Sequence, residues 1–248
     1  MITKLMIILL ILLLLVGRIR GLKAFICFFL NYLLVIFYII FMGFGFNAIV
    51  LAIILCVLAT IIILFILNGL NIKTLSSFLS VMSVLFITFI FVYIIGKTAN
   101  IQGFSFDSLE SIGSYSFDIN YNMINVIIGM YLICTIGTII DTSISVSSAL
   151  NEINENNPQI SERELFKSGM NVGRDILSTT INTLYFAFFG GFIGFFFLHQ
   201  KASFSYIINY KEFAAEVIEL LFCFISSILI IPVTSFICSK FLKKNIVF

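Results

Sequence analysis

Long uninterrupted apolar runs constrain this chain more than any other feature of its sequence. Most of them are about 17–25 residues long, the length of helix that crosses the hydrocarbon core of a bilayer. They do not alternate polar and apolar residues as half-buried strands do, so they predict helices. Because 61% of the residues are hydrophobic and only 10% are charged, the chain has too little polar surface for a water-soluble domain.

We therefore predict an all-α, polytopic membrane protein that forms a single integral membrane domain over residues 1–248. The expected seven transmembrane helices cover about 5–16, 24–42, 48–67, 74–96, 122–148, 176–198 and 216–239. The first run is similar to the core of a signal peptide, but no small-residue cleavage site follows it, which favours an uncleaved span. Residues 97–121 predict an amphipathic segment on the membrane surface. Ser161 and Glu164 form a capping-box pattern that predicts the start of a short helix.

The lysines and arginines are unevenly divided between the two sides that these spans define. With the C-terminus inside, ten of the fourteen fall in inner segments and four in outer segments, and inner loops are the ones that carry excess cations. We therefore predict that the N-terminus lies outside and the C-terminus inside. A net charge of +2 gives no reason to expect a nucleic-acid partner, and the lipid bilayer is the expected surrounding.

Polar residues concentrate between Gly137 and Gly191, in two segments that must still cross the membrane. Asp141 is the only acid deep inside an apolar segment. A carboxylate there costs about 2.5–3.5 kcal/mol on insertion scales, and such groups usually face a bundle interior or a wet cavity. Spacings of three and four residues place a set of polar side chains on one face of this helix. The set comprises Thr138, Asp141, Ser145, Ser148 and Glu152.

The following helix carries a matching polar face, with Arg174, Ser178, Asn182 and Tyr185 at helical spacing and Thr179 and Thr183 alongside. The two helices leave the same loop and run antiparallel, so Asp141 and Asn182 are expected at the same depth. We predict a polar seam in which Asn182 or Thr179 donates a hydrogen bond to Asp141. Asp141 is the candidate ion- or proton-responsive group. The supporting residues are Thr138, Ser145, Ser148, Arg174, Asp175, Thr179, Asn182 and Thr183.

Two interpretations of this seam stay open. Hydroxyls and amides in membrane helices often serve only to join helices, at about 0.6 kcal/mol per bond. An acid is a costly way to join helices, which favours a group that binds a proton or cation and changes partners between two states.

Other chemistry is not indicated by the sequence. The five cysteines are isolated in apolar runs, and His199 is the only histidine, so we expect no metal site and no cofactor. No nucleophile–base pair, phosphate-binding glycine loop or metalloprotease motif is present, so we expect that the protein is not an enzyme.

At these same residues the chain resembles the YibE/F family of bacterial multi-pass membrane proteins, and its YibF-type members in particular. The resemblance covers most of the chain. Its most specific segments are 141–153, 165–175, 182–184 and 231–234. Where the family usually has Gly-Thr, this chain has Ser178-Thr179. The resemblance implies a bacterial inner-membrane protein with a YibE-type partner or a homo-oligomeric state, and it brings no settled biochemical function.

A second similarity, over about 55 residues, is to the transmembrane core of resistance-nodulation-division permeases and SecD/SecF. The matching features are Gly137 with Asp141, the 149–173 loop, Arg174, Thr179 to Thr183, and Gly190-Gly191. This analogy implies a related core in the C-terminal half and a transporter or translocase subunit, coupled to ions or protons through Asp141. The alternative is a membrane scaffold or assembly protein that transports nothing. The sequence identifies no substrate.

Overall fold

The computed structural model describes residues 1–98 and 122–243, and every regular element in these ranges is a helix. The elements are α1 (Ile2–Gly43), α2 (Ala48–Ile61), η1 (Ile62–Ile66), α3 (Ile72–Thr98), α5 (Met123–Asn156), α6 (Glu162–Leu198), α7 (Phe204–Asn209) and α8 (Lys211–Lys243). In the described residues, six helices are long and apolar enough to cross a membrane. The predicted all-α polytopic architecture is confirmed. The predicted surface segment falls mostly in 99–121, outside the described residues.

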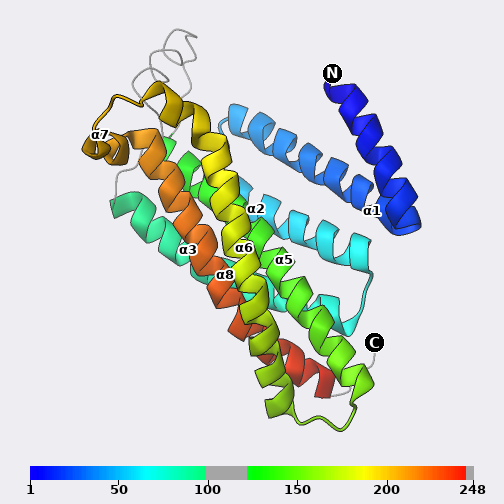
Figure 1. Cartoon of the computed structure of the whole chain (residues 1–248). Coiled ribbons are helices and arrows are strands. Elements are labelled where there is room, and N and C mark those ends of the chain that lie inside the picture. The colour runs from blue at the N-terminus through cyan, green and yellow to red at the C-terminus, as the bar shows by residue number, and fades with distance from the viewer. Residues whose placement is uncertain (99–121, 244–248) are drawn as a thin grey trace.

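The first two predicted spans lie within one element, α1, which is interrupted at a single residue. Arg18 has φ 47° and ψ −126°, outside the helical region, and the helix resumes directly after it. Figure 1 shows the two parts of α1 meeting at a sharp angle. The sequence predicted two spans separated by a connection of several residues (17–23), and the structure has a one-residue break instead.

Helix α5 forms the centre of the molecule. It packs against α3, α8, α2 and α6, whereas α1 packs mainly on α2 at one side of the bundle. Figure 1 shows this arrangement, with the α1–α2 layer beside the bundle of α3, α5, α6 and α8. A close approach of α2 to α5 occurs at Gly129, where an added Cβ would stand 3.2 Å from the Ala48 carbonyl oxygen and 3.3 Å from the Ala52 Cβ.

Helix α6 begins where the sequence predicted a helix start, but it does not stop before the membrane. Ser161 Oγ accepts a hydrogen bond from the Glu164 backbone N–H, and the Glu164 carboxylate accepts one from the Ser161 N–H. The predicted short helix and the sixth span are therefore one continuous helix of 37 residues. Its length of about 55 Å exceeds the roughly 30 Å hydrocarbon core, so its first turns extend into water.

Helix α6 packs closely on α8 at two glycines in its first third. A Cβ on Gly173 would overlap the side chain of Ile231, and one on Gly169 would stand 2.7 Å from Ser235 Oγ. Leu165, Gly169 and Gly173 are the buried residues of α6, so the remaining length of this helix faces outward or lies at partly covered positions.

Candidate functional site

The predicted site residues lie on α5 and α6, and most of them are exposed. Asp141 and Ser145 on α5 are exposed, and Thr138 and Ser148 are partly buried. On α6 the exposed members are Arg174, Asp175, Thr179, Asn182 and Thr183. The exposed side of α5 is narrow, because Thr142 and Ser143 next to Asp141 are both buried.

Hydroxyl groups at the predicted seam bond to their own helix and do not cross to the other. Ser145 Oγ donates to the Asp141 carbonyl at 2.7 Å, and Thr138 Oγ1 donates to the Thr135 carbonyl at 2.9 Å. Thr179 and Thr183 likewise donate to carbonyls one turn earlier in α6, at 2.8 and 2.9 Å. Such back-bonds satisfy the hydroxyls without joining two helices.

The Asp141 carboxylate is left without a hydrogen-bond partner among the described residues of the chain. The structure therefore does not bring Asp141 into hydrogen-bond contact with Asn182 or Thr179 within one copy. Asp141 is an exposed residue within a helix that is long and apolar enough to cross a membrane, and an unpaired charge in such a segment is costly.

The level of Asp141 relative to α6 follows from a contact near the connection between the two helices. Leu150 Cδ1 lies 3.0 Å from the position of a Cβ on Gly169, so these two residues are level. Moving nine residues along each helix away from the α5–α6 connection, about 14 Å, reaches Asp141 on α5 and Ser178 on α6. Asp141 is thus level with Ser178 and Thr179, and Asn182 lies one turn further from the α5–α6 connection.

A different set of hydroxyls joins the helices, and sequence analysis did not single it out. It lies on the opposite side of α5 and comprises Ser77 and Thr88 of α3, Ser143 and Ser147 of α5, and Ser226 and Thr234 of α8, here called the hydroxyl core. Ser77 Oγ shares a hydrogen bond of 2.6 Å with Ser147 Oγ. Ser143 Oγ lies 3.1 Å from Thr234 Oγ1, and all six residues are buried.

The signal for the hydroxyl core was present in the sequence as small polar residues at helical spacing in three separate helices. Ser77 and Thr88 are eleven residues apart in α3, Ser143 and Ser147 four apart in α5, and Ser226 and Thr234 eight apart in α8. Small residues at such spacing let membrane helices approach closely. The hydroxyl core is therefore a structural joint at the centre of the bundle.

Nearer the other end of α5, three side chains from α5 and α8 meet. The Tyr131 hydroxyl donates to the Ala215 carbonyl at 3.1 Å, and the thiols of Cys134 and Cys223 are 3.4 Å apart. These contacts continue the α5–α8 joint beyond the hydroxyl core. Among the described residues, no group of three His, Cys, Asp or Glu side chains is arranged to hold a metal ion.

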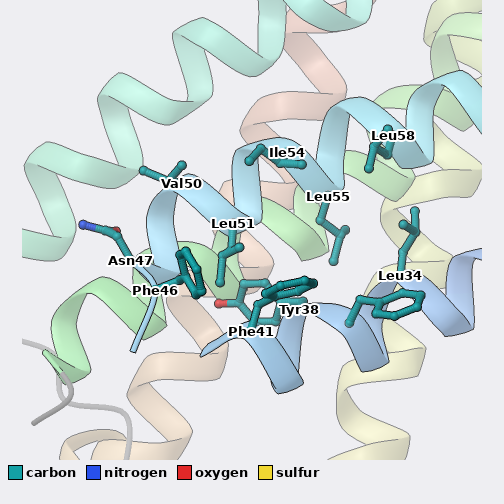
Figure 2. A pocket seen from close by; sticks show the side chains of 11 residues that line it. Leu34, Tyr38, Phe41, Phe46, Asn47, Val50, Leu51, Ile54, Leu55 and Leu58 are labelled. Atoms are coloured by element: carbon teal, nitrogen blue, oxygen red, sulfur yellow. The ribbon is translucent and has the colours of Figure 1, made fainter. Parts of the chain in front are cut away.

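The structure also has an apolar pocket between α1 and α2, with a volume of about 670 Å³ (Figure 2). Leu34, Phe37 and Phe41 line one side and Val50, Ile54 and Leu58 the other. The Asn47 side chain at its edge accepts a hydrogen bond from the Ile49 N–H and so caps α2. The lining offers no charged group, so this pocket suits hydrocarbon and not polar chemistry.

The apolar helices and the buried hydroxyl pairs between them define a polytopic, all-α membrane protein. The family model described as YibE/F-like protein matches residues 5–244, nearly the whole chain, and the protein belongs to this family. The resemblance predicted from residues 141–153 and 165–175 is thereby confirmed. No curated protein and no solved structure matches the chain.

Proposed function

We propose that this protein is a subunit of a transporter or translocase in a bacterial cytoplasmic membrane, and that Asp141 couples it to a proton or cation. The observation that carries the proposal is the position of Asp141. It is exposed on the central helix at the depth of Ser178 and Thr179, and it has no hydrogen-bond partner among the described residues of its own chain.

An acid in this position favours an ion-responsive role over a purely structural one. The same bundle joins its helices with neutral hydroxyls that are buried and paired, as Ser77 and Ser147 are. An acid that served only as a joint would be expected in a similar paired position. An acid that takes up and releases a proton or cation must instead be reachable and must keep more than one partner available.

The proposal implies that a single copy of this chain is only part of the working assembly. A carboxylate facing acyl chains costs about 2.5–3.5 kcal/mol, so a stable protein covers it with another polypeptide or with water. We propose a YibE-type chain or a second copy as the covering partner. We place the loop between α5 and α6 in the cytoplasm, the N-terminus outside and the C-terminus inside, following the distribution of Lys and Arg.

The competing function is a membrane scaffold that transports nothing. One observation favours it: the hydroxyls of Ser145, Thr179 and Thr183 are satisfied within their own helices, so they offer no ready-made ion pathway. In this case Asp141 would only determine which partner binds.

The experiment that separates the two functions measures proton flux into proteoliposomes with a pH-sensitive dye trapped inside. The purified protein is reconstituted with whatever chain co-purifies with it, and Asp141→Asn is compared with the unaltered protein. Asp141→Asn should lower the flux at least tenfold, because an amide neither takes up nor releases a proton near neutral pH.

The matched control is Glu155→Gln, the same chemical change near the end of α5, where Asn151 Nδ2 donates to the carboxylate on the exposed surface. This variant should keep the flux. Unchanged flux in Asp141→Asn, with an unaltered elution profile in detergent, contradicts proton coupling through Asp141.

A further inference from the structure

We propose that Cys134 of α5 and Cys223 of α8 are a redox-active pair, which an apolar disulfide compound oxidises to a disulfide bond between the two helices. Their sulfur atoms are 3.4 Å apart, and the Cys223 thiol donates a hydrogen bond to the Cys134 sulfur. A disulfide bond is about 2.0 Å long, so the two sulfurs need to approach only a little further. The two cysteines are 89 residues apart in the sequence, so the fold alone brings them together.

The other three cysteines of the chain have different surroundings. The thiols of Cys27, Cys56 and Cys238 lie 3.7, 3.6 and 3.9 Å from backbone carbonyl oxygens of a neighbouring element. A free cysteine in such a position acts as a small apolar side chain with a weak donor. Cys134 and Cys223 depart from this pattern because each has the sulfur of the other as its neighbour. Of the five thiols, these two are the ones placed to react with each other.

Contacts between α5 and α8 flank the cysteine pair on both sides. On one side the Tyr131 hydroxyl donates to the Ala215 carbonyl at 3.1 Å, and the Tyr131 ring packs on Phe222 with 5.6 Å between the ring centroids. On the other side Ser143 Oγ lies 3.1 Å from Thr234 Oγ1. These contacts keep the two helices together, so a reagent bound covalently to one cysteine has the second thiol beside it.

Cys134 is the thiol that reacts first. It is partly exposed, whereas Cys223 is only 1% exposed. Cys134 also lies beside the carboxylate of Glu219, one turn before Cys223 in α8. The thiolate and not the thiol is the nucleophile, and a carboxylate within hydrogen-bond reach can take up the thiol proton as a general base. The cluster therefore contains an attacking thiol, a base and a second thiol.

The position of the pair along its helices determines which oxidant suits it. Cys134 follows Met123, the first residue of α5, by eleven positions, and Cys223 follows Lys211, the first residue of α8, by twelve. These separations correspond to about 16 and 18 Å along the helix axes, within segments apolar enough to cross a membrane. Charged groups enter the hydrocarbon of a bilayer at a high cost, whereas apolar compounds dissolve in it. The pair therefore suits an apolar disulfide and not a charged one.

The reaction is a thiol–disulfide exchange in two steps. Cys134 passes its proton to Glu219, and the Cys134 thiolate attacks one sulfur of the oxidant R–S–S–R. The S–S bond of the oxidant breaks, one RS⁻ leaves, and Cys134 is joined to the other half of the oxidant. Cys223 then attacks the Cys134 sulfur, which forms the bond between the helices and releases the second RS⁻. The protons of both cysteines end on the two released thiols, so the cysteine pair loses two electrons and the oxidant gains two.

The product joins α5 to α8 covalently, between the hydroxyl core and the Tyr131 contact. Oxidation therefore locks the interface between these two helices, and reduction by a dithiol releases it. This inference goes beyond the proposed function and does not depend on it. The disulfide is detected without any transport assay, and normal proton flux in Asp141→Asn would leave the inference unchanged.

The experiment treats membranes that contain the full-length protein with dithiodipyridine, an apolar disulfide. The thiols that remain are blocked with N-ethylmaleimide in SDS, and the peptides are identified by mass spectrometry. The unaltered protein should give a linked peptide that contains Cys134 and Cys223 and should keep the other three of its five thiols. A linked peptide with a different pair of cysteines, or five free thiols after the treatment, would contradict the proposal.

Single substitutions separate the roles of the two thiols. Cys223→Ser should stop at a mixed disulfide between Cys134 and the reagent, because no second thiol follows. Cys134→Ser should leave Cys223 unmodified, because Cys223 is buried. The matched control Cys56→Ser should form the bond between α5 and α8 at the rate of the unaltered protein. A mixed disulfide that persists in the unaltered protein, or full modification of Cys223 in Cys134→Ser, would overturn the proposal.

Two further comparisons test the base and the class of oxidant. Glu219→Gln should slow formation of the disulfide at least about fivefold, because an amide does not take up the thiol proton, whereas Glu216→Gln, the same change three residues earlier in α8, should keep the rate. Equal rates in the two variants would contradict the role of Glu219. Oxidised glutathione, a charged disulfide, should react at least about tenfold more slowly than dithiodipyridine. Equal rates for the two reagents would show that the pair is reached from water, which contradicts an apolar oxidant.

Discussion

The two polar sides of α5 differ in what meets them. On one side Ser143 and Ser147 are buried and pair with hydroxyls of α3 and α8. On the other side Asp141 and Ser145 are exposed, and no hydrogen bond there reaches another helix of the described structure. The comparison teaches that polar residues of one membrane helix differ in role: Ser143 and Ser147 join helices within the chain, whereas the Asp141 carboxylate is left with no hydrogen-bond partner in the described structure.

The largest expected effect concerns glycines on the two sides. A Cβ on Gly173 overlaps Ile231, which is buried, so Gly173→Ala should destabilise the fold by roughly 1–3 kcal/mol. Gly137→Ala adds the same atom in open space and should cost nothing in the isolated chain. Unfolding in detergent measures both. Equal losses of stability would show that the two sides of the bundle are packed alike.

A smaller effect is expected from serines on opposite sides of α5. Ser147→Ala removes the buried 2.6 Å pair with Ser77 and should cost about 0.5–1.7 kcal/mol, whereas Ser145→Ala loses only a back-bond and should cost less than about 0.3 kcal/mol. A double-mutant cycle with Ser77→Ala should give a coupling energy near 0.6 kcal/mol for Ser147. A coupling energy of zero would mean that this pair does not join α3 to α5.

The smallest expected change in stability concerns a buried threonine that lies between the two polar sides of α5. Thr142 is buried next to Asp141, and its hydroxyl has no hydrogen-bond partner among the described residues. Thr142→Val keeps the shape and removes a polar group that is unsatisfied, so stability should stay the same or rise by up to about 1 kcal/mol. A loss above 1 kcal/mol in the same unfolding assay would indicate that the hydroxyl is bonded after all.

Much of the architecture could be predicted from the sequence, because span length and helix caps are local properties. The start of α6 at the capping box of Ser161 and Glu164 is an example. The break in α1 was placed in the right region but as a loop, since a single residue with positive φ leaves no distinct pattern. Pro232 lies inside α8 without ending it. In membrane helices neighbouring groups tolerate such a proline.

The side of α5 that packs could not be predicted, and the reason is physical. In water the apolar side of a helix turns inward, but in lipid the hydrocarbon gains little by leaving the surface. Ser143 and Asp141 belong to equally regular patterns on α5, and periodicity does not rank them. Their ranking depends on Ser77 and Thr234, whose positions are known only once the helices are assembled.

The break at Arg18 has a consequence for how the chain sits in its surroundings. An unbroken helix of 42 residues would be about 63 Å long, roughly twice the thickness of the hydrocarbon core of a bilayer. A straight rod of that length would tilt steeply or push its end far into water. The bend shown in Figure 1 resolves the misfit, because it lets the first sixteen or so residues turn away from the line of the rest. The side chain at this corner is the long, polar-tipped one of Arg18, a kind that reaches from apolar surroundings toward polar headgroups.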